Sequence, residues 1–349
     1  MRPVEVAGRR VGSGAPCFVI AEAGVNHNGD LGLAHRLVDA AAAAGADAVK
    51  FQTFDPARLV TAHASKAEYQ TRNMGSDESQ YEMLLRLVLS REAHQELRRH
   101  AEERGLIFLS TAFDEESADF LEWLGVPAFK VPSGELTNHP FLAHLARKGR
   151  TLLISTGMST LEEVGAALEI VRAAGSTPAA VLHCVSSYPA APADCNLRAM
   201  ETMRQTFGIP VGWSDHTLQV TVATAAVALG AAILEKHLTL DQSLPGPDHK
   251  ASLEPHQFTE LVKVVREAEA ALGDGIKRPT VAEAEVARHA RRGLHVTRDL
   301  AAGHVLTRND VAALRPAGGL SPADAPRVVG RLLRRALASG EMLNESDLA

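Results

Sequence analysis

The sequence is poor in cysteine and has no long apolar run. Its three cysteines, Cys17, Cys184 and Cys195, are scattered over 349 residues. They are too few for a disulfide framework or a thiolate zinc site, and they are typical of small buried side chains in a reducing cytosol. No apolar run approaches the roughly 18 residues of a membrane span, and residues 1–6 lack the apolar region of a signal peptide. We expect a cytoplasmic protein without a membrane partner.

An excess of positive charge is also absent. The net charge is -6, which does not favour nucleic acid as a partner. The charge is nevertheless uneven along the chain. From Gly275 onward there are 12 Lys and Arg against 8 Asp and Glu, a balance of +4, so the earlier part carries -10. This asymmetry indicates a second module with a different task.

What the sequence does contain is a regular alternation of strand-like and helix-like segments. Eight such units in about 255 residues match the size and rhythm of a (β/α)8 TIM barrel, an α/β fold. A doubly wound sheet is the alternative, but no Gly-x-Gly-x-x-Gly turn follows the first strand. The eight predicted strands, each followed by a helical segment, cover residues 18–24, 47–53, 106–111, 128–133, 151–156, 179–185, 210–216 and 232–238.

Two stretches interrupt this alternation. Residues 56–77 form a long polar insert after the second strand, without a clear period. Residues 273–292 begin with a glycine-rich break and continue as a charged, helical connector. The Arg-rich residues 293–349 are too few for more than a small β-rich domain of short strands and turns. We therefore predict a barrel domain over 1–272, a linker over 273–292 and a second domain over 293–349.

The last two predicted strands end in histidines, His216 and His237. Ser214 and Glu235 precede them by two residues and so share their faces, whereas Asp215 points the other way. If the strands are parallel neighbours, the two imidazoles form half of a metal site. Open positions for substrate oxygens indicate Mn²⁺ or Mg²⁺ acting as a Lewis acid. The alternative is a pair of hydrogen-bonded core histidines.

Two lysines, Lys50 and Lys130, lie inside otherwise apolar strands. An unpaired buried ammonium group is costly, so each requires an anionic partner, either a bound anion or Glu22, Glu135 or Glu235. Two lysines with several hydroxyl groups at the mouth of a barrel predict a phosphate or carboxylate ligand. A lone strand-end hydroxyl more often satisfies backbone groups. The strand-end hydroxyls include Thr111, Ser133, Ser155, Ser186 and Ser214.

Eight segments together resemble the sialic acid synthases, the family of bacterial N-acetylneuraminate synthase and its relatives that make legionaminic and pseudaminic acids. They span nearly the whole predicted barrel. The tail resembles the antifreeze-like (SAF) domain of these enzymes, through LRP at 314–316 and VGR at 329–331. The barrel segments are IAEAGVNHNG at 20–29, ADAVKFQT at 46–53, KVPSGE at 130–135, ISTGM at 154–158, LHCVSSYP at 182–189, GWSDHT at 212–217, EKH at 235–237 and PGPDHKASL at 245–253.

The resemblance implies a transferase that condenses phosphoenolpyruvate with an open-chain N-acetylmannosamine-type sugar. The product would be a nine-carbon sialic acid, N-acetylneuraminate or a close analogue, with phosphate released by C–O cleavage. His216 and His237 would hold the metal. Catalytic roles fall to Glu22, Glu135 and Lys50. Phosphoenolpyruvate would be bound by Lys50, Thr111, Lys130, Ser133, Ser155, Ser186 and Ser214, and the sugar by Gln52, Tyr188, Asp248 and Arg315.

The resemblance also implies a homodimer in which the small domain swaps over the partner's barrel, with Arg315 reaching the sugar. The sugar itself stays open. The alternative substrate is a 2,4-diacetamido-2,4,6-trideoxy hexose, which a legionaminic or pseudaminic acid synthase would use. Some neuraminate synthases have Asn where this chain has Ser186, and this difference weakens the choice of sugar more than the choice of reaction. A metal-dependent aldolase or hydrolase would not need Lys50 and Lys130 together. A further alternative is a barrel that binds carbohydrate without catalysis. In such a protein we would expect active-site residues to be lost, but they are present in this sequence.

Overall fold

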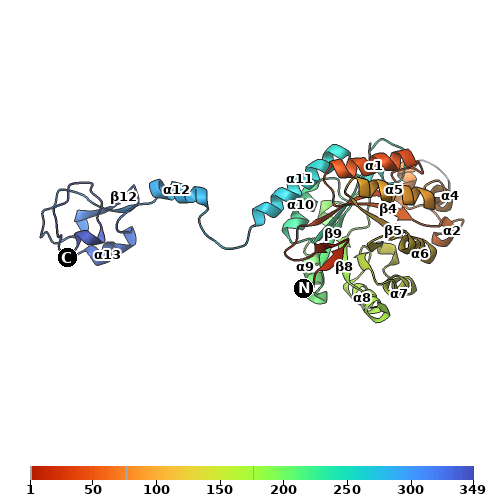
Figure 1. The fold of residues 1–349 in the computed structure, drawn as a ribbon, viewed down its shortest axis with the longest axis horizontal. Helices are drawn as coiled ribbons and strands as arrows, with labels where there is room; N and C mark the ends of the chain where they lie inside the picture. Colours follow the sequence, from red (N-terminus) through yellow and green to blue (C-terminus); the bar gives the residue numbers. More distant parts are fainter. Residues whose placement is uncertain (1, 75–77, 176) are drawn as a thin grey trace. The chain divides into compact units, whose positions relative to one another are not determined.

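Eight parallel strands close into a barrel, which confirms the predicted fold (Figure 1). The computed structural model describes residues 2–74, 78–175 and 177–349. Neighbouring strands pair in the order β10-β3-β4-β5-β6-β7-β8-β9, so the last strand closes against the first. The strands are β3 (Phe18–Gly24), β4 (Ala48–Thr53), β5 (Ile107–Ala112), β6 (Ala128–Val131), β7 (Thr151–Ser155), β8 (Ala179–Cys184), β9 (Val211–Asp215) and β10 (Ile233–His237).

Helices surround the barrel, and local capping explains where several of them begin and end (Figure 1). The Asp30 and Ser90 side chains accept hydrogen bonds from backbone N–H groups in the first turns of α1 and α5. Gly45, with φ of 80°, follows α1 in the left-handed conformation that ends a helix. The outer helices are α1 (Leu31–Ala43), α5 (Arg91–Glu103), α6 (Glu115–Leu124), α7 (His139–Arg147), α8 (Leu161–Gly175), α9 (Ala199–Phe207), α10 (Val220–Ala228) and α11 (Pro255–Leu272).

A short hairpin, β1 (Val4–Val6) and β2 (Arg9–Val11), covers the base of the barrel and was not predicted. Its valines pack in one cluster with inward residues of the barrel strands, including Leu109 and Leu153. Thr151 Oγ1 also donates a hydrogen bond to the backbone oxygen of Glu5 at 2.7 Å. Because this end is filled with apolar side chains, polar chemistry is confined to the opposite end, where the strands terminate.

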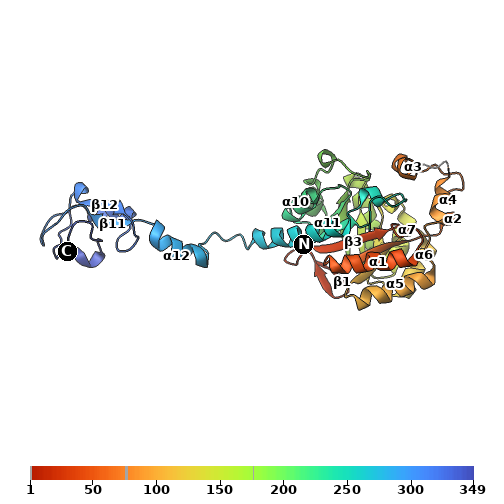
Figure 2. The same ribbon diagram turned by 90° about the horizontal axis from the view of Figure 1, so that it is seen from above.

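The insert after β4, in which the sequence showed no clear period, contains short helices. It contains α2 (Pro56–Leu59) and α3 (Glu68–Met74), and α4 (Gln80–Leu85) follows. The signal for α2 was present, because Asp55 caps the helix and Pro56 occupies its first position. Residues 75–77 of the predicted insert lie outside the described residues. Figure 2 shows α2 and α4 at the end of the barrel opposite β1.

The chain divides into two compact units, Met1–Gly273 and Asp274–Ala349. The second unit begins with α12 (Val281–Ala290), which lies within the predicted linker, and contains α13 (Ala325–Val328). Its strands β11 (Gly293–Val296) and β12 (Val311–Leu314) pair antiparallel. Its apolar side chains form a core of their own, as expected for a small β-rich domain.

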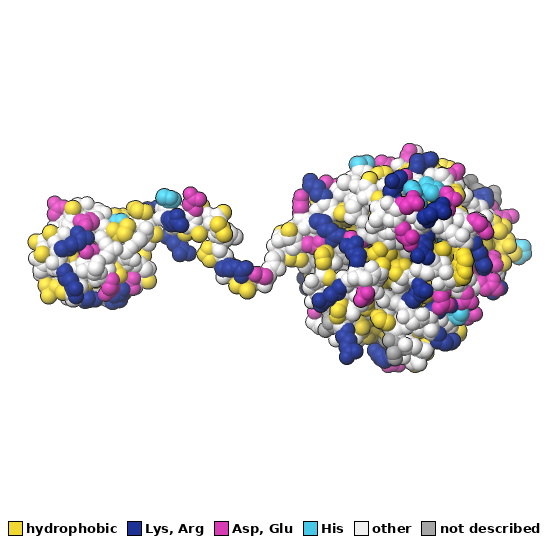
Figure 3. Space-filling model, viewed as in Figure 1, with side chains coloured by type: hydrophobic (Ala, Val, Ile, Leu, Met, Phe, Trp, Pro, Cys, Tyr) yellow, Lys and Arg dark blue, Asp and Glu magenta, His cyan; other side chains and the backbone are white. Residues whose placement is uncertain are grey.

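The surface of the barrel unit mixes charges of both signs. Basic and acidic side chains are interspersed over the face seen in Figure 3. Over the described ranges, no helix is long and apolar enough to cross a membrane.

Candidate active site

A cavity of about 460 Å³ opens at the carboxyl ends of the barrel strands. This volume is in the range of small-molecule sites. The structure brings together every predicted site residue except Glu135 and Arg315. The predicted residues that line the cavity are Glu22, Lys50, Gln52, Thr111, Lys130, Ser133, Ser155, Ser186, Tyr188, Ser214, His216, His237 and Asp248.

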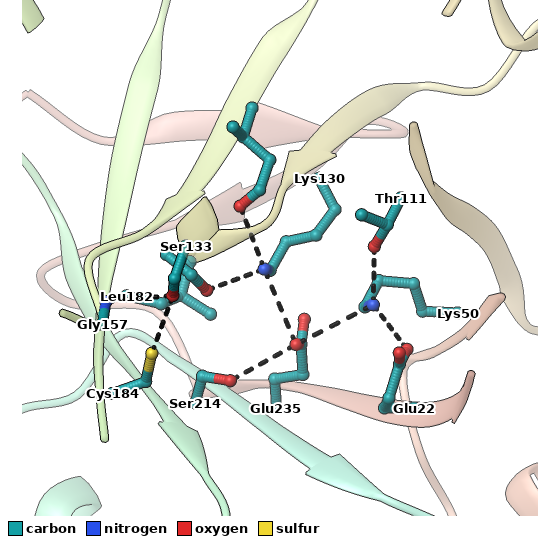
Figure 4. A network of polar contacts seen from close by, with 12 residues as sticks. Glu22, Lys50, Thr111, Lys130, Ser133, Gly157, Leu182, Cys184, Ser214 and Glu235 are labelled. Carbon is teal, nitrogen blue, oxygen red and sulfur yellow. Dashed lines mark hydrogen bonds and ion pairs between the residues drawn. The ribbon is translucent and has the colours of Figure 1, made fainter. Parts of the chain in front are cut away.

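Two buried lysines and two buried glutamates form the charged floor of this cavity (Figure 4). Lys50 Nζ lies 2.5 Å from Glu22 Oε2. Lys50 and Lys130 also converge on one oxygen, Glu235 Oε1, at 3.9 and 3.7 Å. The requirement of each lysine for an anionic partner is therefore met from within the barrel. An anionic ligand entering the cavity would meet two ammonium groups at one place.

Strand register explains why these side chains meet. Glu22 on β3 pairs with Lys50 on β4, and Thr111 on β5 pairs with Lys130 on β6. Side chains at paired positions of adjacent strands point to the same face of the sheet. Barrel closure then carries Glu235 on β10 to a position beside Lys50 and Lys130. Sequence reasoning noted Glu235 as a possible partner but assigned it no role in the site.

Hydroxyl groups surround the two ammonium groups. Lys50 Nζ donates to Thr111 Oγ1 at 2.8 Å and Lys130 Nζ donates to Ser155 Oγ at 2.7 Å. Ser214 Oγ donates to Glu235 Oε1 at 3.3 Å. These side chains are almost fully buried, so their hydroxyl groups are held in place rather than solvated. They could serve as hydrogen-bond donors to a bound phosphate or carboxylate.

The absence of a side chain at Gly157 leaves room for the side chains of Ser133, Cys184 and Ser186 to lie close together. Its backbone N–H donates to Ser133 Oγ at 2.9 Å, and Ser133 Oγ lies 3.1 Å from Cys184 Sγ. A Cβ at Gly157 would collide with the Ser133, Cys184 and Ser186 side chains. Glycine is therefore required here by space, since its conformation is not left-handed.

The two glutamates are shifted in opposite directions by their surroundings. Burial raises the pKa of Glu22 above its usual range, although Lys50 acts against that shift. Burial acts the same way on Glu235, but Lys130 and Lys50, with His216 and the Ser214 hydrogen bond, outweigh it and hold the pKa of Glu235 below its usual range. Two carboxyl groups with opposed pKa shifts provide an acid–base group and a permanent anion in one site. Glu22 is the one suited to carry a proton.

The two histidines lie at the end of adjacent parallel strands, as the sequence predicted. Their ring centroids are 5.5 Å apart. His216 Nδ1 donates to the backbone oxygen of Val185 at 2.7 Å, so its Nε2 carries the free lone pair. Burial lowers the pKa of His216 to about 4 and lowers that of His237 strongly. Both rings are therefore neutral, which is the form that binds metal ions.

The residues present fit a divalent ion held by two imidazoles. His237 Nδ1 is buried without a hydrogen-bond partner among the described residues, which the alternative of two satisfied core histidines does not explain. The backbone carbonyl at His216 is the kind of outer contact that orients a metal ligand. Among the residues that the structure describes, no group of three or more His, Cys, Asp or Glu could hold a metal. Two imidazoles would leave coordination positions for water or substrate.

The insert supplies part of the cavity that sequence reasoning missed. Tyr69 of α3 stacks on Tyr188 with ring centroids 4.9 Å apart, and Tyr188 lies 4.1 Å from the His216 ring. Asn73 Nδ2 donates to the backbone oxygen of Pro247 at 2.7 Å, joining α3 to the loop after β10. Burial raises the pKa of Asp248 in this loop to about 7. The one feature of the sequence that could have indicated this contribution is Tyr69, an aromatic residue in a largely polar insert.

Glu135 is not brought into the cavity. The predicted strand over 128–133 ends at Val131, because Pro132 has no N–H to continue the ladder. Residues Ser133–Glu135 then form a 3₁₀ turn, and the Glu135 carboxylate accepts a hydrogen bond from Asn138 Nδ2 at 2.7 Å. The change of backbone direction removes Glu135 from the face that Lys130 occupies.

Arg315 belongs to the second unit, where it is exposed directly after β12. Its predicted contact with the sugar stays a prediction.

Comparisons with known proteins assign the chain to a family. A model described as the NeuB family matches residues 37–277, and one described as the SAF domain matches 291–349. The chain is 48% identical over 336 residues to the N,N′-diacetyllegionaminic acid synthase of Legionella pneumophila, covering 95% of this chain and 94% of that protein. It is 41% identical over 330 residues to the enzyme of the same name from Campylobacter jejuni, covering 94% and 99%.

A solved structure shows the same architecture. The N-acetylneuraminic acid (sialic acid) synthetase of Leptospira borgpetersenii, in complex with citrate, aligns with a TM-score of 0.72 and 31% identity, covering 82% of this chain and 95% of that one. The NeuB model covers more than half of the chain, and the two relatives match it over nearly their full lengths. The chain is therefore an enzyme, a transferase of the sialic acid synthase type with a C-terminal SAF domain, and it belongs to the NeuB family.

Proposed function

We propose that the chain condenses phosphoenolpyruvate with the aldehyde of an open-chain N-acylated amino sugar, giving a nine-carbon 2-keto acid and inorganic phosphate. The observation that carries this proposal is the convergence of Lys50 and Lys130 on Glu235 Oε1 inside a buried, hydroxyl-lined cavity. Such a floor matches a ligand that bears both a phosphate and a carboxylate. A metal-dependent aldolase or hydrolase that uses only the two histidines would not need a pair of buried lysines. A non-catalytic carbohydrate-binding barrel is disfavoured because the predicted site residues are present and most of them lie together in one cavity.

We infer that the sugar is a 2,4-diacetamido-2,4,6-trideoxy hexose. The sequence interpretation placed an N-acetylmannosamine-type sugar first and the trideoxy sugar as its alternative. Two relatives that match over nearly their full lengths are both named N,N′-diacetyllegionaminic acid synthase. Their names support the alternative, so the product would be a legionaminic acid.

The reaction forms one C–C bond and one C–O bond, and it breaks the C–O bond to phosphate. The alkene carbon of phosphoenolpyruvate attacks the sugar aldehyde, whose oxygen takes up a proton, and water adds to the cation left at C2 with loss of a proton. The bond between C2 and the phosphate oxygen then breaks, leaving a ketone and free phosphate. We assign proton transfer in these steps to Glu22, because its pKa is raised by burial. Lys50 and Lys130 balance the charge of phosphate and carboxylate throughout, with hydroxyl groups fixing their orientation.

His216 and His237 would hold a divalent ion, Mn²⁺ or Mg²⁺, which when bound polarises the aldehyde. Around the sugar we place Gln52, Tyr188 and Asp248, all of which line the cavity. Gln52 Nε2 donates to Glu22 Oε1 at 3.1 Å, so it also orients the proposed proton carrier. Arg315 of a partner chain would complete the sugar site in a cytoplasmic homodimer with exchanged second domains.

Phosphate release tests this function directly. Purified enzyme with Mn²⁺ and phosphoenolpyruvate is offered 2,4-diacetamido-2,4,6-trideoxymannose, N-acetylmannosamine or no sugar, and free phosphate is measured. Release that depends on the sugar, with a nine-carbon keto acid identified by mass spectrometry, is expected. Release without any sugar, or no release with every sugar, contradicts the proposal. Phosphoenolpyruvate labelled with ¹⁸O in its bridging oxygen should pass the label to phosphate, as C–O cleavage requires.

A further inference from the structure

The cavity has two unlike halves. The half formed by the barrel strands carries the two lysines, the two glutamates and the histidines. The other half comes from the residue after β4, the end of α2 with the residue after it, and α4 with the residues just beyond it. Its side chains are aliphatic or aromatic, and we call this set the apolar wall. The wall consists of Phe54, Leu59, Val60, Met83, Leu84 and Leu87.

The apolar wall is a packed surface rather than a set of loose side chains. Phe54, Met83, Leu84 and Leu87 are each no more than 8% exposed and form a cluster separate from the main core. The half-buried Leu59 and Val60 pack against that cluster. A wall supported in this way keeps its shape when a ligand arrives, so it can discriminate between ligands of different shape and polarity.

Most polar groups beside the apolar wall are uncharged; the carboxyl group of Asp248, near Tyr69, is the acidic one. Gln70 and Gln80 line the same part of the cavity with Tyr69, and amide side chains suit the N–H and C=O groups of an N-acyl substituent. Of the described residues lining the cavity, Lys50 and Lys130 are the only lysines or arginines, and both lie in the charged half.

Basic side chains in the insert and just after α4 form ion pairs with a carboxylate. Lys66 and Arg86 both form ion pairs with Glu78. Among the described residues, a phosphate group near the apolar wall would thus find neither a lining cation nor several hydroxyl groups. A hydroxyl group there would be buried against hydrocarbon, which is unfavourable without a partner.

We propose that the apolar wall contacts the sugar from C4 to C6, at the end away from the aldehyde. It accommodates the methyl group of an N-acetyl substituent and favours a methyl group at C6 over a hydroxyl or phosphate group there. Leu59 and Leu84 are the specificity-determining residues. The inference rests on the proposed function, because it places phosphoenolpyruvate on the lysines and the aldehyde at the histidines. The other end of the sugar then faces the insert, since both halves line one cavity.

Two sugars that differ only at C6 isolate this effect. The first is 2,4-diacetamido-2,4,6-trideoxymannose, and the second is its 6-hydroxy counterpart; N-acetylmannosamine 6-phosphate serves as a charged third. Steady-state kinetics of the full chain with Mn²⁺ and phosphoenolpyruvate give kcat/KM for each. One small group in an apolar pocket changes kcat/KM by roughly 10- to 200-fold. We expect the 6-deoxy sugar to be favoured by about tenfold or more, and the phosphate to be the poorest of the three.

Substitution of the apolar wall should reduce this preference. Leu84→Ala is expected to lower the ratio of kcat/KM between the two matched sugars by about tenfold, without changing the KM for phosphoenolpyruvate. Leu85→Ala is the matched control, because Leu85 is the next residue of α4, is 51% exposed and does not line the cavity. Should Leu84→Ala not fold, Leu59→Ala tests the same wall from α2 at a half-buried position.

The outcomes separate this inference from the proposed function. Absence of sugar-dependent phosphate release would remove the proposed function itself. Release with equal kcat/KM for the two matched sugars would leave the function standing and overturn the role of the apolar wall. A wild-type preference that persists in both Leu84→Ala and Leu59→Ala would also overturn it.

Discussion

Lys236 Nζ lies 2.8 Å from Asp215 Oδ2, and both side chains are fully buried. The pair joins β9 to β10 on the face that points away from the cavity, which confirms that Asp215 faces away from the histidines. Because side chains alternate along a strand, fixing this pair also fixes their neighbours His216 and His237 on the cavity face. A buried ion pair with no direct place in the chemistry thus holds the site in register.

Lys236→Met should destabilise the barrel by about 3–5 kcal/mol, because it leaves the Asp215 carboxylate buried without its partner. Urea unfolding followed by tryptophan fluorescence measures this, since both tryptophans, Trp123 and Trp213, lie in the barrel unit. The double variant Lys236→Met, Asp215→Asn is the control, because it removes both charges. It should recover much of the lost stability, and equal losses in the two variants would argue against the ion pair as the cause.

Lys130→Met should raise the KM for phosphoenolpyruvate by about 10- to 100-fold, the value of a charge-assisted hydrogen bond. The KM for the sugar should change far less, because Lys130 lies in the charged half of the cavity with Ser155 and Glu235. Steady-state kinetics with each substrate varied in turn separates the two constants. Lys250→Met, at an exposed lysine outside the cavity lining, should leave both unchanged. Equal effects on both substrates would remove the assignment of Lys130 to the anion site.

His216→Ala should abolish both metal binding and turnover while the barrel remains folded. The imidazole is one of two neutral rings facing the cavity, so its loss leaves His237 as a single ligand. Mn²⁺ bound per chain, measured by equilibrium dialysis, and phosphate release are the two readouts. His256→Ala removes a histidine whose side chain is 75% exposed and should change neither. Full activity of the wild-type chain after exhaustive chelation would contradict the metal site.

Arg315→Ala should lower kcat/KM for the sugar without affecting the stability of the barrel, if Arg315 reaches the sugar from a partner chain. Deletion of residues 293–349 should abolish turnover for the same reason. The barrel should survive that deletion, because the second unit has its own apolar core. Arg334→Ala, at another exposed arginine of that unit, is the control. A truncated chain with full activity would exclude any contribution of Arg315.

Complementation tests whether the arginine acts across two chains. Mixing Arg315→Ala chains with Lys130→Met chains allows a heterodimer in which one barrel is intact and receives an intact Arg315 from its partner. Partial recovery of activity on mixing is expected for exchanged domains. Activity no greater than the sum of the two variants would indicate that each chain acts alone.

Much of the site was predictable because strand parity is a local rule. Ser214 with His216, and Glu235 with His237, were placed on common faces from their spacing alone, and all four line the cavity. Glu135 was expected at the site from its position just beyond a predicted strand end, and it is not among the residues that line the cavity. Pro132 ends the hydrogen-bonded ladder, and the turn that follows directs Glu135 toward Asn138. The alternation of side chains therefore predicts which face a residue occupies only up to the end of the strand, and not beyond a proline that ends it.

Local patterns in the sequence were enough to predict the order of strands and helices, the barrel and the strand-end side chains, because periodicity and helix capping act over a few neighbouring residues. Which of those side chains meet depends on the tertiary structure. Barrel closure brings Glu235 between Lys50 and Lys130, from positions far apart in the chain. Long-range packing likewise places the apolar wall on the cavity, because its residues come from separate short segments before, within and after the insert.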